Sequence, residues 1–202
     1  LLSAEKHGTT LAVFRGLQPG RFPMRVGNMT VGRVTELGDA VSRFNVGDRV
    51  YGYLPIRETH TVPEERLWVA PPSVMDEELV CVDPAVVALM GVREGNVKLG
   101  ENVAVFGLGA IGLMAVQLSR LSGALTLLGL DPFERRRRLA EKYGADAVID
   151  PKGRDAASEC RDRTDGKGVD VAVETTGSYE ALHDAIKATR YGGAIVTASW
   201  YH

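Results

Sequence analysis

The chain has 202 residues, 45% of them hydrophobic and 25% charged, and its formal net charge is −2 at pH 7. Such a composition is typical of a globular protein with one or two domains, and the charge gives no reason to expect nucleic acid or an anionic membrane as a partner. No apolar run reaches the ~18 residues of a transmembrane helix, and no secretory signal is visible. Cys81 and Cys160 lie far apart, which argues against a disulfide framework and favours a cytoplasmic location. Because the sequence begins at Leu1 and ends directly after a predicted strand, we expect a piece of a longer protein.

The first 80 residues are predicted to be β structure. Runs rich in β-branched residues at 30–35 and 46–51 are separated by turn residues such as Gly38 and Asp39. Prolines exclude long helices from this part of the chain, and they occur at Pro23, Pro55, Pro63, Pro71 and Pro72. Short strands at close spacing predict a small barrel or sandwich.

A helix over 84–94 is predicted to link this β region to the rest of the chain. Asp83 is expected to cap it and Pro84 to be its first helical residue. The sequence therefore predicts two domains, a partial barrel-like catalytic domain over 1–84 and a dinucleotide-binding domain over 85–202.

The second half alternates between strands and helices. Apolar runs predict strands at 102–106, 125–130, 146–149, 170–174 and 194–199, and helices are predicted at 110–121, 133–143, 156–163 and 178–190. Ser178 is expected to cap the last helix and Gly192 to lie near its C-terminal end. This alternation predicts an α/β fold with a doubly wound parallel sheet, covered by helices on both faces.

A glycine-rich turn follows the first of these strands, and its sequence is Gly107-Leu108-Gly109-Ala110-Ile111-Gly112. In a dinucleotide-binding turn, Gly107 allows the tight bend, Gly109 lets a pyrophosphate approach the backbone, and Gly112 lets the helix pack close to the strand. The helix amino terminus, at Ala110 and Ile111, offers free N–H groups and a positive dipole end to the phosphates. A simple turn is the alternative for the glycines alone, but the strand before them and the βα units after them favour dinucleotide binding.

The next strand ends at Asp131, which is the expected determinant of cofactor choice. A carboxylate there accepts hydrogen bonds from the adenosine ribose hydroxyls and repels a 2′-phosphate, so NAD is favoured over NADP. Four arginines follow at 135–138, and Arg136 is the candidate to contact the cofactor. The alternatives are a solvated helix face for the arginines and a helix cap for Asp131.

Two later strand ends are expected to complete the cofactor pocket, because ligands bind at the carboxyl ends of such strands. Backbone groups of the first segment would face the adenine ribose and those of the second the nicotinamide. The two segments are Thr175-Thr176-Gly177 and Ala198-Ser199-Trp200. Ordinary loop chemistry is the alternative for both.

In the order and spacing of its motifs, the chain resembles the medium-chain dehydrogenase/reductase family, the relatives of zinc-type alcohol dehydrogenases. The motifs are Gly27 to Gly32 followed by Val34, the run 44–50, Leu99-Gly100-Glu101 after the linking helix, the turn 107–112, Gly168-Val169-Asp170 with Glu174 and Gly177, and Gly192-Gly193. The resemblance implies a barrel-like (GroES-like) domain followed by a Rossmann domain, and reversible hydride transfer between a small-molecule alcohol and a carbonyl. It also implies that this chain lacks the family's first strands, its sixth Rossmann strand and the segment that returns to the catalytic domain. Since the sixth strand usually helps dimerisation, a homo-oligomer is expected for the full-length protein.

The resemblance also implies three positions for catalytic zinc ligands, and motif alignment places His7, Asn28 and Asp83 there. Asn is a poor zinc ligand, Met29 stands where the acidic partner is expected, and the four-cysteine lobe of the family is missing. We therefore expect no catalytic zinc. A zinc site with unusual ligands, His7 and Asp83 with a third group, remains an alternative.

Without zinc, the developing alkoxide charge needs a hydrogen-bond donor or a general acid. Thr9 stands at the family's proton-relay position, and His7 carries an imidazole that titrates near neutral pH. Both are candidate catalytic residues, with a plain strand threonine and a partly buried histidine as the alternatives. A non-catalytic dinucleotide-binding protein is a further alternative.

Overall fold

The computed structural model describes residues 1–201, apart from the side chain of His7. It divides into two compact units, Leu1–Asp83 and Pro84–His202. No helix in the part of the chain that the structure describes combines the length and the apolar character needed to cross a bilayer.

The second unit is built on a five-stranded parallel sheet, which confirms the predicted α/β fold class. The strands lie in the order β7-β6-β5-β8-β9. Their bounds are Asn102–Phe106 for β5, Thr126–Leu130 for β6, Ala147–Ile149 for β7, Val169–Glu174 for β8 and Thr189–Thr197 for β9. The chain builds outward from β5 to β7 and then returns to the other side of β5, so the strand order reverses between β5 and β8.

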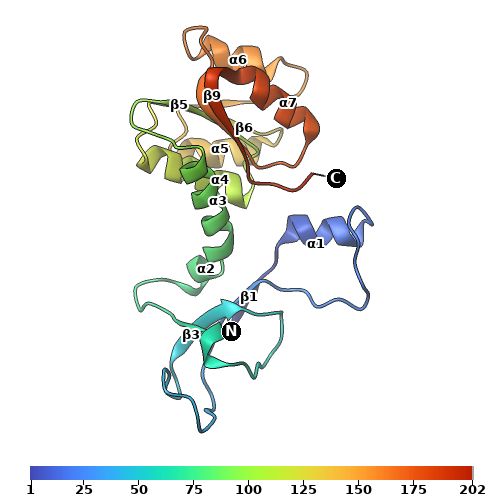
Figure 1. Cartoon of the computed structure of the whole chain (residues 1–202), viewed down its shortest axis with the longest axis vertical. Coiled ribbons are helices and arrows are strands. Elements are labelled where there is room, and N and C mark those ends of the chain that lie inside the picture. Colours follow the sequence, from blue (N-terminus) through green and yellow to red (C-terminus); the bar gives the residue numbers. More distant parts are fainter. Residues whose placement is uncertain (202) are drawn as a thin grey trace. The chain divides into compact units, whose positions relative to one another are not determined.

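Helices cover both faces of this sheet (Figure 1). The cluster on one face includes residues of α3 (Val82–Glu94), α4 (Ala110–Leu121) and α5 (Glu134–Lys142). The cluster on the other face includes residues of α6 (Ala156–Asp162) and α7 (Tyr179–Ala188). The arrangement is that of a doubly wound fold, and its central strands β5, β6 and β8 are buried on both sides.

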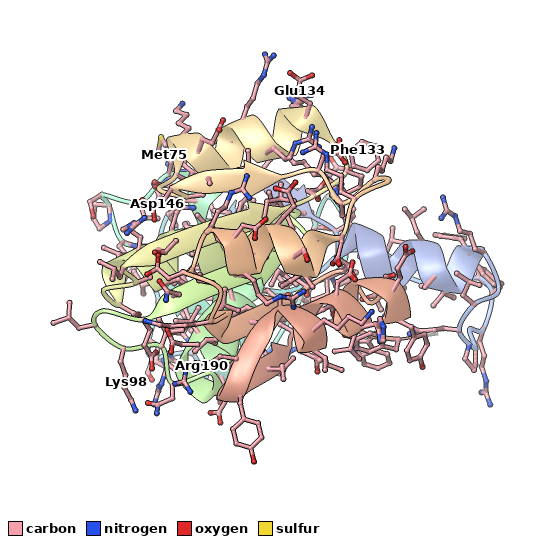
Figure 2. All side chains as sticks on the ribbon, turned by 90° about the horizontal axis from the view of Figure 1, so that it is seen from above. Met75, Lys98, Phe133, Glu134, Asp146 and Arg190 are labelled. Carbon is pink, nitrogen blue, oxygen red and sulfur yellow. The ribbon has the colours of Figure 1, made fainter. Side chains whose placement is uncertain are left out.

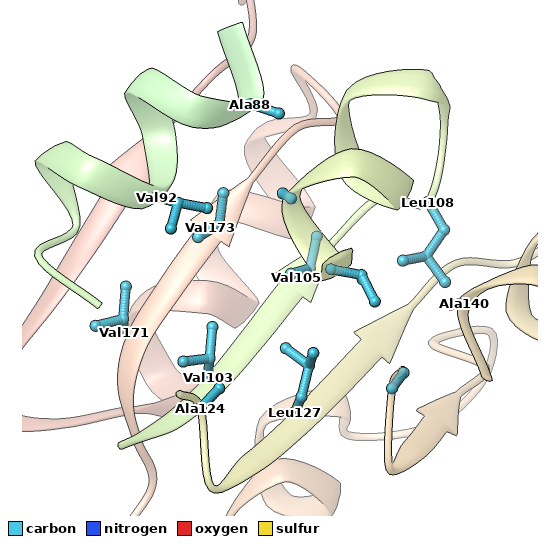
Figure 3. Packing of buried hydrophobic residues seen from close by; sticks show 13 residues of the cluster. Ala88, Val92, Val103, Val105, Leu108, Ala124, Leu127, Ala140, Val171 and Val173 are labelled. Atoms are coloured by element: carbon cyan, nitrogen blue, oxygen red, sulfur yellow. The ribbon is translucent and has the colours of Figure 1, made fainter. Parts of the chain in front are cut away.

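The packing of the core follows from the alternation of side chains along each strand, since successive residues point to opposite faces of the sheet. Val103 and Val105 of β5 point to the face covered by α3 and α4, whereas Ala104 and Phe106 point to the opposite face. Figure 3 shows Val103 and Val105 beside Val173 of β8, with α3 packed over them. An uninterrupted apolar run is therefore what a central strand of this fold requires.

The last helix and strand differ from the prediction. Ser178 caps α7 as predicted, because its Oγ accepts a hydrogen bond from the amide of Ala181. The helix ends at Ala188 rather than at residue 190, since Thr189 adopts an extended conformation with ψ of 135°. Gly192 was expected to end the helix, but it lies inside β9 with a φ of +75°. The pairing of β9 with β8 is irregular at this end, which explains why a glycine is tolerated within the strand.

The linking helix also begins earlier than predicted. It starts at Val82, so Asp83 lies in its first turn and is not its N-cap. The carboxylate of Asp83 instead lies 3.0 Å from the Nζ of Lys6. The prediction of a helix cap at Asp83 is therefore wrong.

The first unit contains a four-stranded antiparallel sheet in the order β1-β2-β3-β4. Its strands are Leu2–Ala4, Met29–Arg33, Arg49–Tyr53 and Trp68–Val69, and its helical segments are α1 (His7–Phe14), η1 (Glu64–Arg66) and α2 (Asp76–Leu79). The strands predicted near residues 30 and 50 are present. Among the described residues the sheet is open, where a small barrel or sandwich was predicted.

Helix α1 was not predicted, and the assignment of residues 7–14 to β structure is wrong. The prolines that argued against helices begin only at Pro23, beyond the end of α1. Thr10 donates a hydrogen bond to the Glu5 carboxylate at 2.5 Å, which ties the first turn of the helix to the preceding segment. A local side-chain bond has overridden a weak strand propensity.

Removal of the Leu127 side chain should destabilise the sheet, because this residue of β6 is fully buried. We expect Leu127→Ala to lower the free energy of unfolding by about 3 kcal/mol, the usual cost of a leucine-sized cavity. Leu125→Ala is the matched control, since Leu125 is 67% exposed, and it should change stability by less than about 0.5 kcal/mol. Urea unfolding followed by circular dichroism measures both, and equal losses would contradict this description of the core.

Candidate functional site

The candidate site lies at the carboxyl ends of the parallel strands, where the strand order reverses between β5 and β8. In open α/β sheets ligands bind at this edge. Figure 2 shows Phe133, which follows β6, at this end, and Asp146 and Arg190, at the starts of β7 and β9, at the other. Each predicted cofactor residue of the second unit lies on a turn at this edge or at the start of the next helix.

The glycine turn brings backbone atoms into close contact. Gly107 has a φ of +89°, and its amide donates to the carbonyl of Leu130 at 2.8 Å, which fastens the turn to β6. A Cβ on Gly112 would lie 1.8 Å from the carbonyl oxygen of Gly107. The packing role predicted for Gly112 is confirmed: only glycine allows α4 to begin this close to the end of β5.

Gly109 differs from these two glycines, because a Cβ there would meet no atom within 4 Å. It is the N-cap of α4 and provides no side-chain hydrogen bond. The first-turn amides of a helix have no intrahelical acceptor, so those of Ala110 and Ile111 point out of the helix end without a side-chain cap. An open, uncapped helix end fits the pyrophosphate of a dinucleotide.

Asp131 lies directly after β6 and is only 2% exposed. Its Oδ2 accepts from the amide of Leu108 at 2.9 Å and from the Arg136 guanidinium at 3.2 Å, and its Oδ1 accepts from the amide of Phe133 at 2.8 Å. Helix α5 is capped at Phe133, so the alternative of a helix cap at Asp131 is wrong. A carboxylate accepts about four hydrogen bonds, which leaves room for one ribose hydroxyl rather than two unless Arg136 moves aside.

The arginines that follow have separate roles. Arg136 stacks 4.9 Å from the centre of the Phe133 ring while it pairs with Asp131. Arg137 donates to the carbonyl of Asp131 at 2.7 Å and pairs with Asp150 at 3.1 Å. The guanidinium of Arg138 lies 2.5 Å from Glu134 on the exposed face of α5. The run is therefore part solvated helix face and part support for Asp131, and Arg136 is the arginine of the run whose side chain reaches the Asp131 carboxylate.

At the end of β8, Thr175 holds the glycine turn in place. Its amide donates to the carbonyl of Phe106 at 2.8 Å, and its hydroxyl donates to the carbonyls of Phe106 and Gly107 at 3.1 and 2.9 Å. These hydrogen bonds thus join the turn after β8 to the glycine turn after β5. The side chain of Thr175 faces the protein, which leaves the backbone of this turn as its contact surface for a ligand.

Glu174 was not predicted as a site residue, although it lies within one of the motifs that carry the family resemblance. Its side chain is fully buried at the end of β8. Oε1 accepts from the amide and from the hydroxyl of Thr176, and Oε2 accepts from the hydroxyls of Ser199 and Tyr201. An acidic residue at the end of an otherwise apolar strand was the available signal, because a buried carboxylate needs several donors.

The segment after β9 is held against the turn after β8. The amide of Ala198 donates to the carbonyl of Glu174 at 2.8 Å, and a Cβ on Gly177 would lie 2.2 Å from the carbonyl oxygen of Trp200. The Trp200 side chain is 70% exposed. Burial and the hydrogen bond to Glu174 raise the pKa of Tyr201 to about 12, so its hydroxyl remains a donor at neutral pH.

The structure places the two candidate catalytic residues of the first unit on α1. His7 is its first residue, but the side chain of His7 lies outside the described part of the chain. Thr9 is exposed on the helix, so the alternative of a plain strand threonine is wrong. Their catalytic roles stay predictions.

The positions aligned with zinc ligands do not form a metal centre among the described residues. The Asp83 carboxylate pairs with Lys6, and desolvation and this carboxylate raise the pKa of Tyr53. Asn28 uses its backbone in the sheet, where its amide donates to the carbonyl of Ala4 at 2.9 Å. Within residues 1–201, with the side chain of His7 left aside, no group of three His, Cys, Asp or Glu side chains is placed to hold a metal ion.

Comparisons with known proteins support this reading of the two units. Residues 3–66 match the family model of the alcohol dehydrogenase GroES-like domain, and residues 110–201 match that of the zinc-binding dehydrogenases. The chain is 41% identical over 184 residues to a D-guloside 3-dehydrogenase of Escherichia coli K12, covering 90% of this chain and 52% of that protein. It is 34% identical over 206 residues to an (R,R)-butanediol dehydrogenase of Bacillus subtilis 168, covering 88% of this chain and 59% of that protein.

Solved structures agree in fold. A zinc-binding dehydrogenase of Sinorhizobium meliloti 1021 bound to NADP matches with a TM-score of 0.86 and 26% identity, over 98% of this chain and 68% of that chain. The 2R,3R-butanediol dehydrogenase of Bacillus subtilis matches with a TM-score of 0.77 and 30% identity, over 90% of this chain and 60% of that chain.

The chain spans little more than half the length of the curated relatives that it matches. Both of its units nevertheless match the models of this family in the expected order. The glycine turn, the buried carboxylate after the next strand and the matches to both units together show that the chain belongs to the medium-chain dehydrogenase/reductase family, among the zinc-type alcohol dehydrogenase relatives.

Proposed function

We propose that the protein is an NAD-dependent oxidoreductase that interconverts an alcohol and a carbonyl by hydride transfer. The observation that carries this proposal is the glycine turn: it is open at Gly109, it leads into an uncapped helix, and the buried carboxylate of Asp131 lies beside it. In this proposal the second unit binds the cofactor, and the first unit is part of the catalytic domain.

The residues of this chain would bind and orient the cofactor. The amides of Ala110 and Ile111 would hold the pyrophosphate, and Asp131 would accept a hydrogen bond from the adenosine ribose. The turns after β8 and β9 would face the remainder of the dinucleotide. When bound, the nicotinamide supplies the hydride chemistry, and the proton of the alcohol must pass to a group of the protein or to water.

The names of the relatives suggest a class of substrate. One is named for position 3 of a guloside, a sugar derivative, and another for a 2R,3R-butanediol. Both names describe a secondary alcohol in a molecule with at least two oxygen substituents. We propose a small polar molecule of that kind, either a diol or a sugar derivative, as the substrate.

We further propose that the reaction does not need catalytic zinc. The support is the chemistry of the aligned positions: Asn28 is a poor ligand, and Asp83 is already paired with the Lys6 ammonium. Proton transfer would then fall to His7 or to Thr9, which lie on the first turn of α1.

Gly109→Ala should weaken cofactor binding without unfolding the protein. The added methyl group meets no protein atom within 4 Å, but it would occupy the space through which the pyrophosphate approaches the backbone. We expect the Kd for NADH to rise by more than about tenfold, equivalent to ~1.4 kcal/mol, while the melting temperature stays the same. Gly38→Ala is the control, since a Cβ there is equally unobstructed. Unchanged NADH affinity in Gly109→Ala, measured by calorimetry, would contradict the proposed site.

The wild-type protein should prefer NADH to NADPH. A 2′-phosphate next to the buried Asp131 carboxylate faces a like charge, so we expect a preference of at least about tenfold. Asp131→Asn should reduce this preference. Asp146→Asn should not, because Asp146 lies at the opposite end of the sheet, where its carboxylate bonds Arg120 and the amide of Leu127. Equal wild-type affinity for the two cofactors would overturn the assignment of NAD.

The turnover rate should not fall when bound metal, zinc included, is removed from the protein. With NAD and a panel of diols and sugar derivatives, the purified protein should produce NADH at a rate unaffected by prior dialysis against a chelator. Elemental analysis should find zinc well below one atom per chain, and His7→Ala or Thr9→Ala should lower turnover without changing NADH affinity. Zinc lost together with activity would refute the metal-free reaction. Binding of NADH without turnover on any member of the panel would favour a non-catalytic protein.

A further inference from the structure

We infer that Glu174 is a positioning residue, which holds the segment after β9 in the place where it lines the nicotinamide end of the cofactor site. This inference rests on the proposed function, since it concerns how the same site is built. Glu174 itself is fully buried, so it acts through the residues that it binds.

The carboxylate of Glu174 joins two segments that are distant in the sequence. On one side it accepts hydrogen bonds from the amide and hydroxyl of Thr176, and its Oε2 lies 3.4 Å from the amide of Gly177. On the other side it accepts from the Ser199 hydroxyl at 2.5 Å and from the Tyr201 hydroxyl. The turn after β8 and the segment after β9 are therefore joined through one side chain.

The other contacts of the segment after β9 come from the backbone of β8, from Gly91 of α3, from Gly177 and from Tyr179 of α7. The ladder between β8 and β9 ends at the pair Glu174 and Thr197, and beyond it the Ala198 amide bonds the Glu174 carbonyl. The Tyr201 ring packs against Tyr179 with 5.1 Å between centres. Because β9 is an edge strand, the segment has a neighbouring strand on one side only among the described residues. Charge-assisted bonds to Glu174 are thus the strongest constraint on the Ser199 and Tyr201 side chains.

The two ends of the site meet at Thr175, whose hydroxyl bonds the carbonyl of Gly107. Among the described residues, however, no hydrogen bond joins the segment after β9 to the glycine turn or to Asp131. The glycine turn and Asp131 belong to β5 and β6, and Asp131 makes none of its hydrogen bonds to the Glu174 group. The Glu174 group belongs to β8 and β9. Displacement of the segment after β9 should therefore disturb the nicotinamide end of the cofactor more than the adenosine and pyrophosphate end.

A comparison of two ligands distinguishes effects on these two ends of the site. ADP-ribose contains the adenosine, the pyrophosphate and the second ribose but no nicotinamide, whereas NADH contains all four groups. We expect Glu174→Gln to raise the Kd of NADH about tenfold more than the Kd of ADP-ribose, since an amide cannot accept from all the donors around it. Fluorescence of the bound nicotinamide should also shift toward that of free NADH.

Asp170→Asn is the matched control. Asp170 lies at the other end of the same strand. Its carboxylate accepts from the amide of Asn102, the first residue of β5, at 2.7 Å and from the Arg190 guanidinium of β9 at 2.5 Å. This substitution removes the same charge and should lower stability, but the ratio of the two affinities should stay at its wild-type value.

Should Glu174→Gln fail to fold, the double variant Ser199→Ala with Tyr201→Phe removes two donors and keeps the carboxylate. It should change the affinity ratio in the same direction. A ratio that stays at the wild-type value in a folded variant overturns the inference and leaves the proposed function intact. A wild-type protein that binds neither NADH nor ADP-ribose refutes the proposed function, and the inference fails with it.

Discussion

The close approach of the α4 helix to the end of β5 is the constraint on which the second unit depends. The Cα of Gly112 faces the carbonyl oxygen of Gly107 at a distance that no side chain permits. This contact directs the first turn of α4 toward the sheet edge and leaves its amides uncapped. It also brings Leu108, which is fully buried, over the core between α4 and β6. The turn therefore serves packing and ligand access through the same backbone geometry.

Buried or half-buried carboxylates then connect the strand ends around this turn. Asp131 joins the glycine turn to the end of β6, and Glu174 joins the turn after β8 to the segment after β9. At the opposite edge, Asp146 and Asp170 accept from strand amides and pair with arginines. A parallel sheet leaves amides and carbonyls unpaired at its ends, and acidic side chains satisfy many of the amides. The carboxyl edge differs from the other in that its two carboxylates are the more deeply buried.

The first unit is a four-stranded sheet with a short helix, and it carries the positions that the resemblance aligns with the family's catalytic groups. Asp83, which is one of these positions, and residues next to the others have partners within this unit. The amide of Gly27 donates to the carboxylate of Glu5, which also accepts from the Thr10 hydroxyl, and Asp83 pairs with Lys6. These bonds fasten the chain on both sides of α1. The proposed chemistry of the protein therefore depends on the side chains that α1 presents.

The sequence by itself determined the elements whose signal is local. The apolar run of β5, the amphipathic helices and the glycine turn were recognisable because period and turn chemistry act over a few residues. Helix α1, the early start of α3 and the end of α7 depended on single hydrogen bonds and on contacts with distant segments. Only the tertiary structure decided that Asp131 has three hydrogen-bonding partners, that Thr175 holds the glycine turn, and that Glu174 binds Ser199 and Tyr201. The hydrogen bond between Ser199 and Glu174 joins residues 25 positions apart, and that between Thr175 and Phe106 joins residues 69 positions apart. No local sequence pattern specifies such contacts.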